Sequence, residues 1–134
     1  MSLSVSLIAL PADEGATLAF VFRGLAEKSG GRVSVETIAR DIASGDLTAW
    51  TVWDGQQSLA WVLTQVYTAP TGLKIFRIEG IVGRQRRAWL HLMSEMISAA
   101  KLNGCAIVEC TARLGWRHEI PYLLHTANHL EAII

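Results

Sequence analysis

The sequence has no long apolar run and no basic segment at its start. Its 134 residues are 51% hydrophobic, but no stretch approaches the roughly 20 consecutive apolar residues that a membrane-spanning helix needs. The N-terminus lacks the basic region that precedes the apolar part of a secretory signal. We therefore expect a protein that is soluble, has no membrane partner and stays in the cytoplasm.

The sequence also has no excess of charge of either sign. Twelve Lys and Arg residues balance twelve Asp and Glu residues, so the formal net charge is zero. A balanced chain has no overall field that would attract nucleic acid or an anionic membrane. The composition therefore argues against nucleic acid as a partner.

Cysteine is scarce, with only Cys105 and Cys110 in the chain. The two lie in a segment with the pattern of a β-strand, where residues an odd number of positions apart point to opposite faces. They are therefore not expected to form a disulfide with each other, and reduced cysteines are typical of the cytoplasm. Neither has a basic neighbour at the spacing of a nucleophile, so a structural role is predicted for both.

The chain has no repeats, linkers or low-complexity tracts, and its length suits one domain spanning residues 1–134. After a first short strand, apolar residues at positions 18, 21, 22 and 25 predict a helix that begins near Pro11 and stops at residues 29–31. A second helix is predicted after Ser34, which has the character of an N-cap, and it ends at residues 44–46.

Three strands are predicted next, at residues 47–53, 59–68 and 73–82. The first two are rich in Thr, Val, Trp and Tyr and flank an Asp54-Gly55 pair, which is a strong hairpin signal. An apolar stripe over residues 89–100 predicts a long helix, and residues 105–111 predict a strand. A strand, a crossover helix and a strand imply a parallel pair. Another helix is predicted over residues 116–128, and a last short strand over residues 130–134.

This order of elements resembles the GNAT superfamily of N-acetyltransferases over almost the whole chain. The segment "NGCAIVECTARLGWRHEI" is similar to a stretch of GNAT-like proteins encoded by tailed phages and prophages; the matching positions are Gly104, Cys105, Val108, Arg113, Gly115 and Trp116. The resemblance implies an α/β fold in which an antiparallel meander joins a parallel βαβ unit in one mixed central sheet, with helices on both faces. A phage-encoded protein would lie in the cytoplasm of its host.

The resemblance also implies a site for acetyl-coenzyme A (acetyl-CoA). In active members, the fourth strand ends in a loop of the type Arg/Gln-x-x-Gly-x-Gly/Ala, where small residues and unpaired helix N–H groups hold the pyrophosphate. The corresponding residues here are "GRQRRA", so Arg86 stands where the central glycine belongs and the loop is degraded. The acyl-CoA-binding residues that the resemblance implies are Ile81, Val82, Gly83, Arg84, Arg86, Arg87 and Ala88.

The three arginines of this turn have three interpretations. Cations at a helix N-terminus oppose the helix dipole, which is a weak indication that an anion binds among them. The anion could belong to acyl-CoA, to another phosphate-bearing ligand or to a nucleic-acid backbone. Alternatively, the arginines are solvated surface charges at a strand–helix junction.

Two residues match the positions of family catalytic groups. Glu79 lies where many members keep a carboxylate that takes the proton of the acceptor amine, and Tyr122 lies roughly where they keep a tyrosine that protonates the leaving thiolate. Glu79 is equally well interpreted as a solvent-facing strand residue on the same face as Arg77. The Gly-Phe pair that usually follows the family tyrosine is replaced by Thr126 and Ala127.

Other candidate groups favour structural roles. His125 and His129 could share a helix face as a metal pair, but neither His118 nor any other residue completes the site, so we predict no metal. The five tryptophans, Trp50, Trp53, Trp61, Trp89 and Trp116, could stack on bases, but their positions favour core packing. We expect Trp89 and Trp116 in particular to be largely buried.

Two functions remain open from the sequence. One is an acetyltransferase-like protein of the phage type whose acetyl-CoA-dependent N-acyltransferase activity is degenerate or absent, and which binds a protein partner. The other is an active acetyl-CoA-dependent N-acetyltransferase. Whether the chain is an enzyme therefore depends on the turn at residues 83–88.

Overall fold

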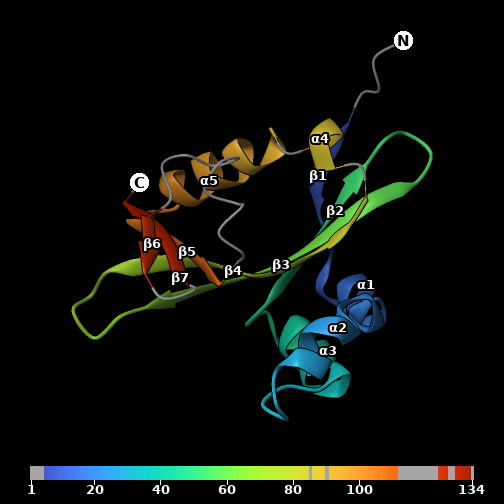
Figure 1. Cartoon of the computed structure of the whole chain (residues 1–134), viewed down its shortest axis with the longest axis horizontal. Coiled ribbons are helices and arrows are strands. Elements are labelled where there is room, and N and C mark those ends of the chain that lie inside the picture. The colour runs from blue at the N-terminus through green and yellow to red at the C-terminus, as the bar shows by residue number, and fades with distance from the viewer. Residues whose placement is uncertain (1–4, 85, 90, 112–123, 127–128, 134) are drawn as a thin grey trace.

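The computed structural model describes residues 5–84, 86–89, 91–111, 124–126 and 129–133. One sheet contains, in spatial order, β1 (Ser6–Ala9), β2 (Thr48–Trp53), β3 (Ser58–Thr68), β4 (Lys74–Gly83), β5 (Ile107–Thr111), β7 (His129–Ile133) and β6 (Leu124–Thr126). Figure 1 shows α5 (Leu92–Leu102) on one face of this sheet and α1 (Ala12–Thr17), α2 (Arg23–Lys28) and α3 (Val35–Ser44) on the other. The mixed sheet with helices on both faces confirms the predicted fold class.

Strands β1 to β4 form the predicted antiparallel meander. At the β2–β3 turn, the carboxylate of Asp54 accepts hydrogen bonds from the backbone N–H groups of Gln56 and Gln57, each at 2.8 Å. These bonds lower the pKa of Asp54. Strand β5 pairs in parallel with β4, which confirms the predicted βαβ unit.

The single helix predicted from Pro11 to residue 29 is three shorter segments. Helix α1 ends at Thr17 with Leu18 as its C-cap, a 3₁₀ segment η1 (Ala19–Phe22) follows, and α2 then continues to Lys28. A 3₁₀ helix has three residues per turn, so Ala19 and Phe22 face the same side, and both are 1% exposed. Both residues thereby belong to the core on this side of the sheet.

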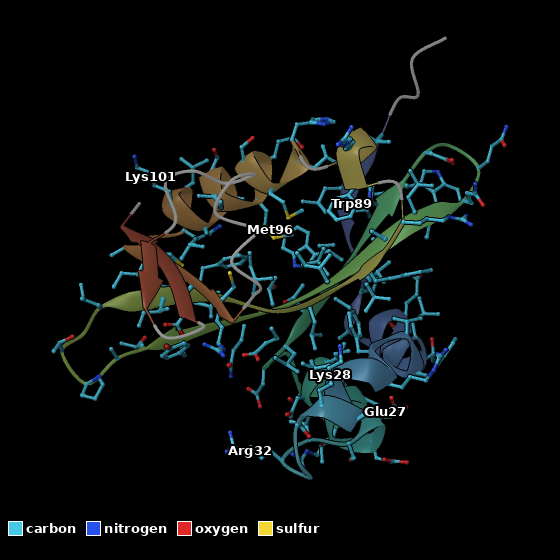
Figure 2. All side chains as sticks on the ribbon, in the orientation of Figure 1. Glu27, Lys28, Arg32, Trp89, Met96 and Lys101 are labelled. Carbon is cyan, nitrogen blue, oxygen red and sulfur yellow. The ribbon has the colours of Figure 1, made fainter. Side chains whose placement is uncertain are left out.

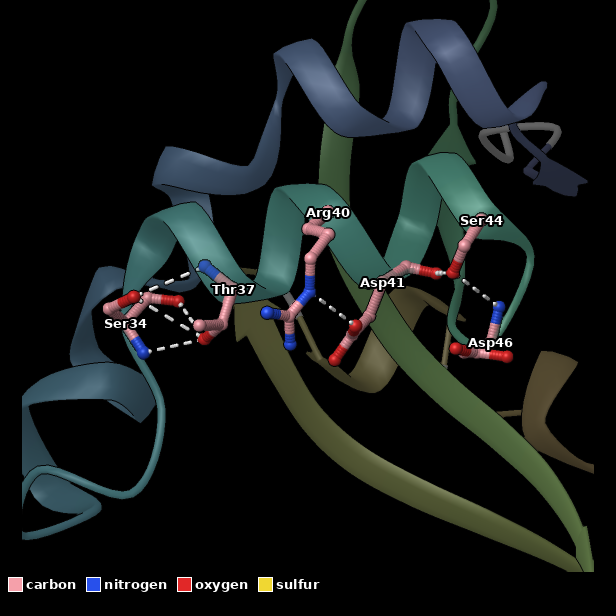
Figure 3. A network of polar contacts seen from close by, with 6 residues as sticks. All are labelled: Ser34, Thr37, Arg40, Asp41, Ser44 and Asp46. Atoms are coloured by element: carbon pink, nitrogen blue, oxygen red, sulfur yellow. Dashed lines mark hydrogen bonds and ion pairs between the residues drawn. The ribbon is translucent and has the colours of Figure 1, made fainter.

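Helix α3 begins at the predicted Ser34 and ends at a glycine. The Ser34 hydroxyl accepts from the Thr37 N–H at 3.1 Å, and the Thr37 hydroxyl accepts from the Ser34 N–H at 2.8 Å, a reciprocal capping box (Figure 3). Gly45 follows the helix with a φ of 87°, a left-handed conformation that favours glycine. Helix α3 and the segments around it form the core on their side of the sheet, here named the α3 core, which includes Ala19, Phe22, Ile38, Ile42 and Leu63.

The helix predicted over residues 89–100 is divided into α4 (Arg86–Trp89) and α5. Both pack against the opposite face of the sheet, and Figure 2 shows Trp89 and Met96 directed toward it. The resulting core, here named the α5 core, includes Val52, Leu59, Val62, Phe76, Ile78, Trp89, Met93, Met96 and Val108. No helix within the described residues has the length and hydropathy to cross a membrane.

The prediction of a helix over residues 116–128 is wrong for residues 124–126, the part of this segment that the structure describes. Leu124–Thr126 is the strand β6, and it pairs with β7, which itself pairs antiparallel with β5. Strand β7 confirms the predicted terminal strand. Residues 124–126 form a strand instead of the predicted helix because β7 supplies hydrogen-bond partners for their backbone, as β5 does for the backbone of β7.

The two cysteines are free and buried, as predicted. The expectation that they point to opposite faces is wrong, because both belong to the α5 core. Strand β5 begins only at Ile107, so the alternation of a strand does not apply to Cys105.

Candidate active site

The described pairing of β4 with β5 covers only the first half of β4. The parallel pairing runs from Ile75 with Ile107 to Ile78 with Cys110, whereas β4 continues to Gly83. Within the described residues, positions 79–83 of β4 have no partner on β5.

A β-bulge on β4 follows Ile78, the last residue with a described partner on β5. On β3, Leu63 pairs with Gly80 and the next residue, Thr64, pairs with Ile78, so Glu79 is the extra residue on β4. Bulges redirect side chains and are common beside active sites. Glu79, predicted as a catalytic base, therefore lies at this bulge, next to the last described pair of β4 with β5.

Glu79 belongs to a polar network that spans three strands. Arg77 Nε lies 3.0 Å from Glu79 Oε1, and Arg77 Nη1 donates to Glu109 Oε1 at 3.1 Å. The hydroxyl of Tyr67 on β3 donates to the same oxygen of Glu109. The sequence placed Arg77 and Glu79 on one face with Phe76 and Ile78 on the other, and the burial of that second pair in the α5 core confirms it.

The network changes the protonation of its members. Burial, together with the hydrogen bond to Glu109 and the charge of that carboxylate, raises the pKa of Tyr67 to about 12. Burial lowers the pKa of Arg77, but the charges of Glu79 and Glu109 outweigh it, and the net shift is upward. Burial also raises the pKa of Cys110, which keeps its thiol protonated and agrees with the structural role predicted for it.

The glycine that opens the predicted phosphate turn has a packing role. A Cβ atom on Gly83 would lie 2.4 Å from the Cβ of Ala60 and 2.7 Å from the carbonyl oxygen of Leu59. Real Cβ atoms essentially never approach so closely, so only glycine lets β4 lie this close to β3. The presence of Gly83 therefore needs no phosphate ligand to explain it.

Arg84, the next residue, makes hydrogen bonds within the chain through its backbone N–H, its backbone carbonyl and its guanidinium. Its N–H donates to the carbonyl oxygen of Leu59 at 2.9 Å. Its own carbonyl oxygen accepts from the indole Nε1 of Trp89 at 2.7 Å. Its guanidinium donates to Gln57 Oε1 at 2.6 Å. The start of the turn is thus closed by contacts within the chain.

The remaining predicted cofactor residues continue from β4 into α4. Ile81 is half-buried against the α5 core, and Val82 is 36% exposed. Arg86 and Ala88 belong to α4, and the Arg87 side chain is exposed. Helix α4 therefore begins at Arg86, before the first residue of the helix predicted over residues 89–100. Tyr122, the predicted catalytic acid, lies outside the described residues.

The histidine and tryptophan predictions have different outcomes. His125 and His129 lie on two strands, β6 and β7, so the shared helix face that a metal pair would need does not exist. Trp89 is 2% exposed, which confirms its predicted burial, while Trp116 and His118 lie outside the described residues. Trp53 is 38% exposed, so the expectation of core packing does not hold for it.

Sequence reasoning missed Tyr67, Glu109 and the indole of Trp89 as functional-site residues. The alternation along β3 and β5 could have placed Tyr67 and Glu109 on the same face as Arg77, because the register pairs Arg77 with both Gln65 and Glu109. No local pattern indicated the bond from Trp89 to Arg84. Among the described residues, no three His, Cys, Asp or Glu side chains lie close enough to hold a metal ion.

Comparison with known proteins identifies the fold. No protein-family model and no curated protein matches the sequence. A Trypanosoma brucei acetyltransferase has a TM-score of 0.63 and 14% identity, with 92% of this chain and 95% of that chain covered. A ribosomal-protein-alanine N-acetyltransferase from Brucella melitensis biovar Abortus has a TM-score of 0.61 and 13% identity, covering 88% and 87% of the two chains. A GNAT-family protein from Desulfovibrio desulfuricans has a TM-score of 0.58 and 10% identity, covering 97% and 99%.

The chain has the GNAT fold. Identities of this size show the fold alone, so the function depends on the site. Glu79 lies on β4 shortly before the turn that was predicted to bind acyl-CoA. The turn does not suit it, because the N–H of Arg84 is already used and Arg86 replaces the glycine that lets the backbone approach a pyrophosphate.

Proposed function

We propose that this chain is a GNAT-fold, acetyltransferase-like protein of the phage or prophage type whose acetyl-CoA-dependent N-acyltransferase activity is degenerate or lost. The observation that supports it best is the closure of the turn through Arg84, whose N–H, carbonyl and guanidinium all bond within the chain. A pyrophosphate needs free N–H groups and room for close approach. Here Leu59, Trp89 and Gln57 occupy the groups of Arg84, and Arg86 adds a side chain where the family has none.

Such a protein would have the fold of an enzyme but would act by binding a partner. The exposed side chain of Arg87 remains able to contact a small anion or an acidic segment of a protein partner at the surface. Such contacts would not need the close backbone approach that coenzyme A requires.

A second candidate function is active N-acetyl transfer, and the position of Glu79 favours it. The carboxylate lies at the bulge of β4, next to the last described pair with β5. Acetyl-CoA, when bound, would supply an activated acetyl thioester, and Glu79 would accept the proton of an acceptor amine. Tyr122 would be the proton donor to the leaving sulfur. Against this, one oxygen of Glu79 is held by Arg77 at 3.0 Å.

An acetyl-transfer assay distinguishes the two functions. Release of the coenzyme A thiol is followed with acetyl-CoA and a panel of primary amines comprising a polyamine, an aminoglycoside and a peptide with a free N-terminus. If the activity is lost, the rate of thiol release with the wild type should be no higher than with Glu79→Gln or with buffer alone. An amine-dependent rate that disappears in Glu79→Gln, while an Asp46→Asn control keeps it, would establish the active enzyme instead.

A further inference from the structure

A small pocket lies at the β1–β3 side of the sheet, on the face that carries α1. Its volume is about 230 Å³, and its lining includes Ile8, Glu14, Thr51, Trp53, Ser58 and Trp61. We name it the tryptophan pocket. None of its lining residues belongs to the turn at residues 83–88 or to the network around Arg77.

The register of the sheet brings these side chains together. Ile8 pairs with Thr51, and Thr51 pairs with Trp61, so the three lie side by side on one face. Trp53 pairs with Ser58 at the end of the β2–β3 hairpin. Helix α1 then contributes Glu14 to the lining. Residues from three strands and one helix thus converge on the same concavity.

The lining is unusual in leaving large apolar side chains exposed. Trp53 is 38% exposed and Ile8 is 43% exposed, while Trp61 is half-buried. Indoles are large and bury well, so an accessible indole in a concavity is typical of a binding site rather than of core packing. The roughly 300–1,000 Å³ of a drug-sized ligand site exceeds this volume, so the pocket fits a small group and not a whole coenzyme.

The chemistry of the lining favours a cation with apolar substituents. Indole faces attract organic cations through their quadrupole, and Glu14 adds a negative charge. The hydroxyl of Thr51 is directed to Ser58 Oγ at 2.7 Å and lies 3.2 Å from the carbonyl oxygen of Ala60. No basic side chain lines the pocket within the described residues, so an anion or a sugar would find few donors there.

We propose that the tryptophan pocket binds a small organic ammonium group, held by the indoles of Trp53 and Trp61 and by the charge of Glu14. The ligand class is a methylated or alkylated amine. The inference does not depend on acyl transfer, because the site is separate from β4 and from its turn.

The test compares choline with 3,3-dimethylbutan-1-ol, which has the same shape without the charge. The chain contains five tryptophans, and their indole N–H signals are resolved by NMR and assigned by single Trp→Phe substitutions. Choline should shift the Trp53 and Trp61 signals in a saturable way and leave the Trp50 and Trp89 signals unmoved. The uncharged alcohol at equal concentration should shift none of them.

Substitutions at two exposed residues test the roles of the pocket lining. Trp53→Leu should weaken choline binding by about tenfold, because a desolvated cation–π contact is worth roughly one such factor. Glu14→Gln should weaken it by several-fold, whereas Asp13→Asn, one position away and outside the lining, should not. Circular dichroism confirms that each variant is folded.

Three results would overturn the proposal. No shift with choline would make the pocket a packing feature of the sheet edge. Equal shifts with choline and the alcohol would leave apolar contact without recognition of charge. Equal weakening by Glu14→Gln and Asp13→Asn would show that Glu14 acts only through the general field of α1.

Discussion

Trp89 combines burial with a hydrogen bond, and the two contributions can be separated by substitution. The side chain is 2% exposed, and its indole donates to the Arg84 carbonyl at 2.7 Å. Trp89→Ala should lower the free energy of unfolding by about 3–5 kcal/mol, the usual range for a buried aromatic. Trp89→Phe keeps most of the ring but removes the donor, so we expect a loss of about 1–2 kcal/mol.

Urea denaturation measures both effects, with Trp53→Ala as the control for an exposed indole. Trp53 is 38% exposed, so its truncation should cost clearly less than that of Trp89. A comparably small loss for Trp89→Ala would contradict its place in the α5 core.

Tyr67 should titrate later than an ordinary tyrosine. Its pKa is raised from 10.0 to about 12, so the folded state keeps a proton that the unfolded state loses between those two values. The contribution of Tyr67 to stability is therefore complete below pH 10 and disappears as the pH rises toward 12. The chain has only two tyrosines, so a Tyr122→Phe variant isolates Tyr67 for a phenolate absorbance titration.

The Glu109 carboxylate is the specific partner to test in that titration. Glu109→Gln removes the charge that disfavours the phenolate, so the Tyr67 midpoint should move back toward 10.0. An unchanged midpoint in Glu109→Gln, or a midpoint near 10.0 in the parent, would show that the contact does not control Tyr67.

At the scale of elements, Gly83 determines how closely β4 can approach β3. Gly83→Ala would place a Cβ 2.4 Å from the Ala60 Cβ and 2.6 Å from its Cα. Overpacking of this kind costs about 1–3 kcal/mol. Gly80→Ala on the same strand is the matched control, because its Cβ would meet Leu25 at 3.5 Å, an ordinary contact.

Thermal and urea denaturation should therefore separate the two glycines. The double variant Ala60→Gly, Gly83→Ala should not recover stability, since the backbone atoms of Leu59 and Ala60 remain in the way. If Gly83→Ala were as stable as Gly80→Ala, the packing explanation for Gly83 would be wrong.

Elements with local signals were predictable from the sequence, and elements that depend on distant partners were not. The capping box at Ser34 and the Asp54-Gly55 turn are set by residues within four positions of each other. Strand β6 depends on pairing with β7, and the connecting residues Ala127 and Asn128 are not a strong hairpin pair. The apolar pattern alone therefore favoured a helix there.

In the candidate site, too, local features were predictable from the sequence and contacts with distant residues were not. Alternation along β4 was enough to place Arg77 beside Glu79. The closure of Arg84 could not be predicted, because its partners Leu59 and Gln57 lie on the β2–β3 hairpin, far away in sequence. Only the pairing of β3 with β4 brings them to the turn.

At the scale of the whole molecule, the fold is that of acetyltransferases, whereas the turn at residues 83–88 does not favour acetyl-CoA binding. The chain matches acetyltransferase structures over most of its length with identities of 14% or less. A mixed sheet with this strand order is specified by apolar periodicity and turns, which many sequences satisfy. The chemistry of a phosphate site is specified by a few residues, and in this chain two of them, Gly83 and Arg84, serve packing and internal hydrogen bonds.

The most direct test is a calorimetric titration of the wild-type chain with acetyl-CoA. The closed turn at Arg84 and the side chain of Arg86 predict that the dissociation constant is weaker than about 1 mM, equivalent to less than about 4 kcal/mol of binding free energy. A saturable titration with a dissociation constant in the low micromolar range would contradict the account and would establish an intact acetyl-CoA site.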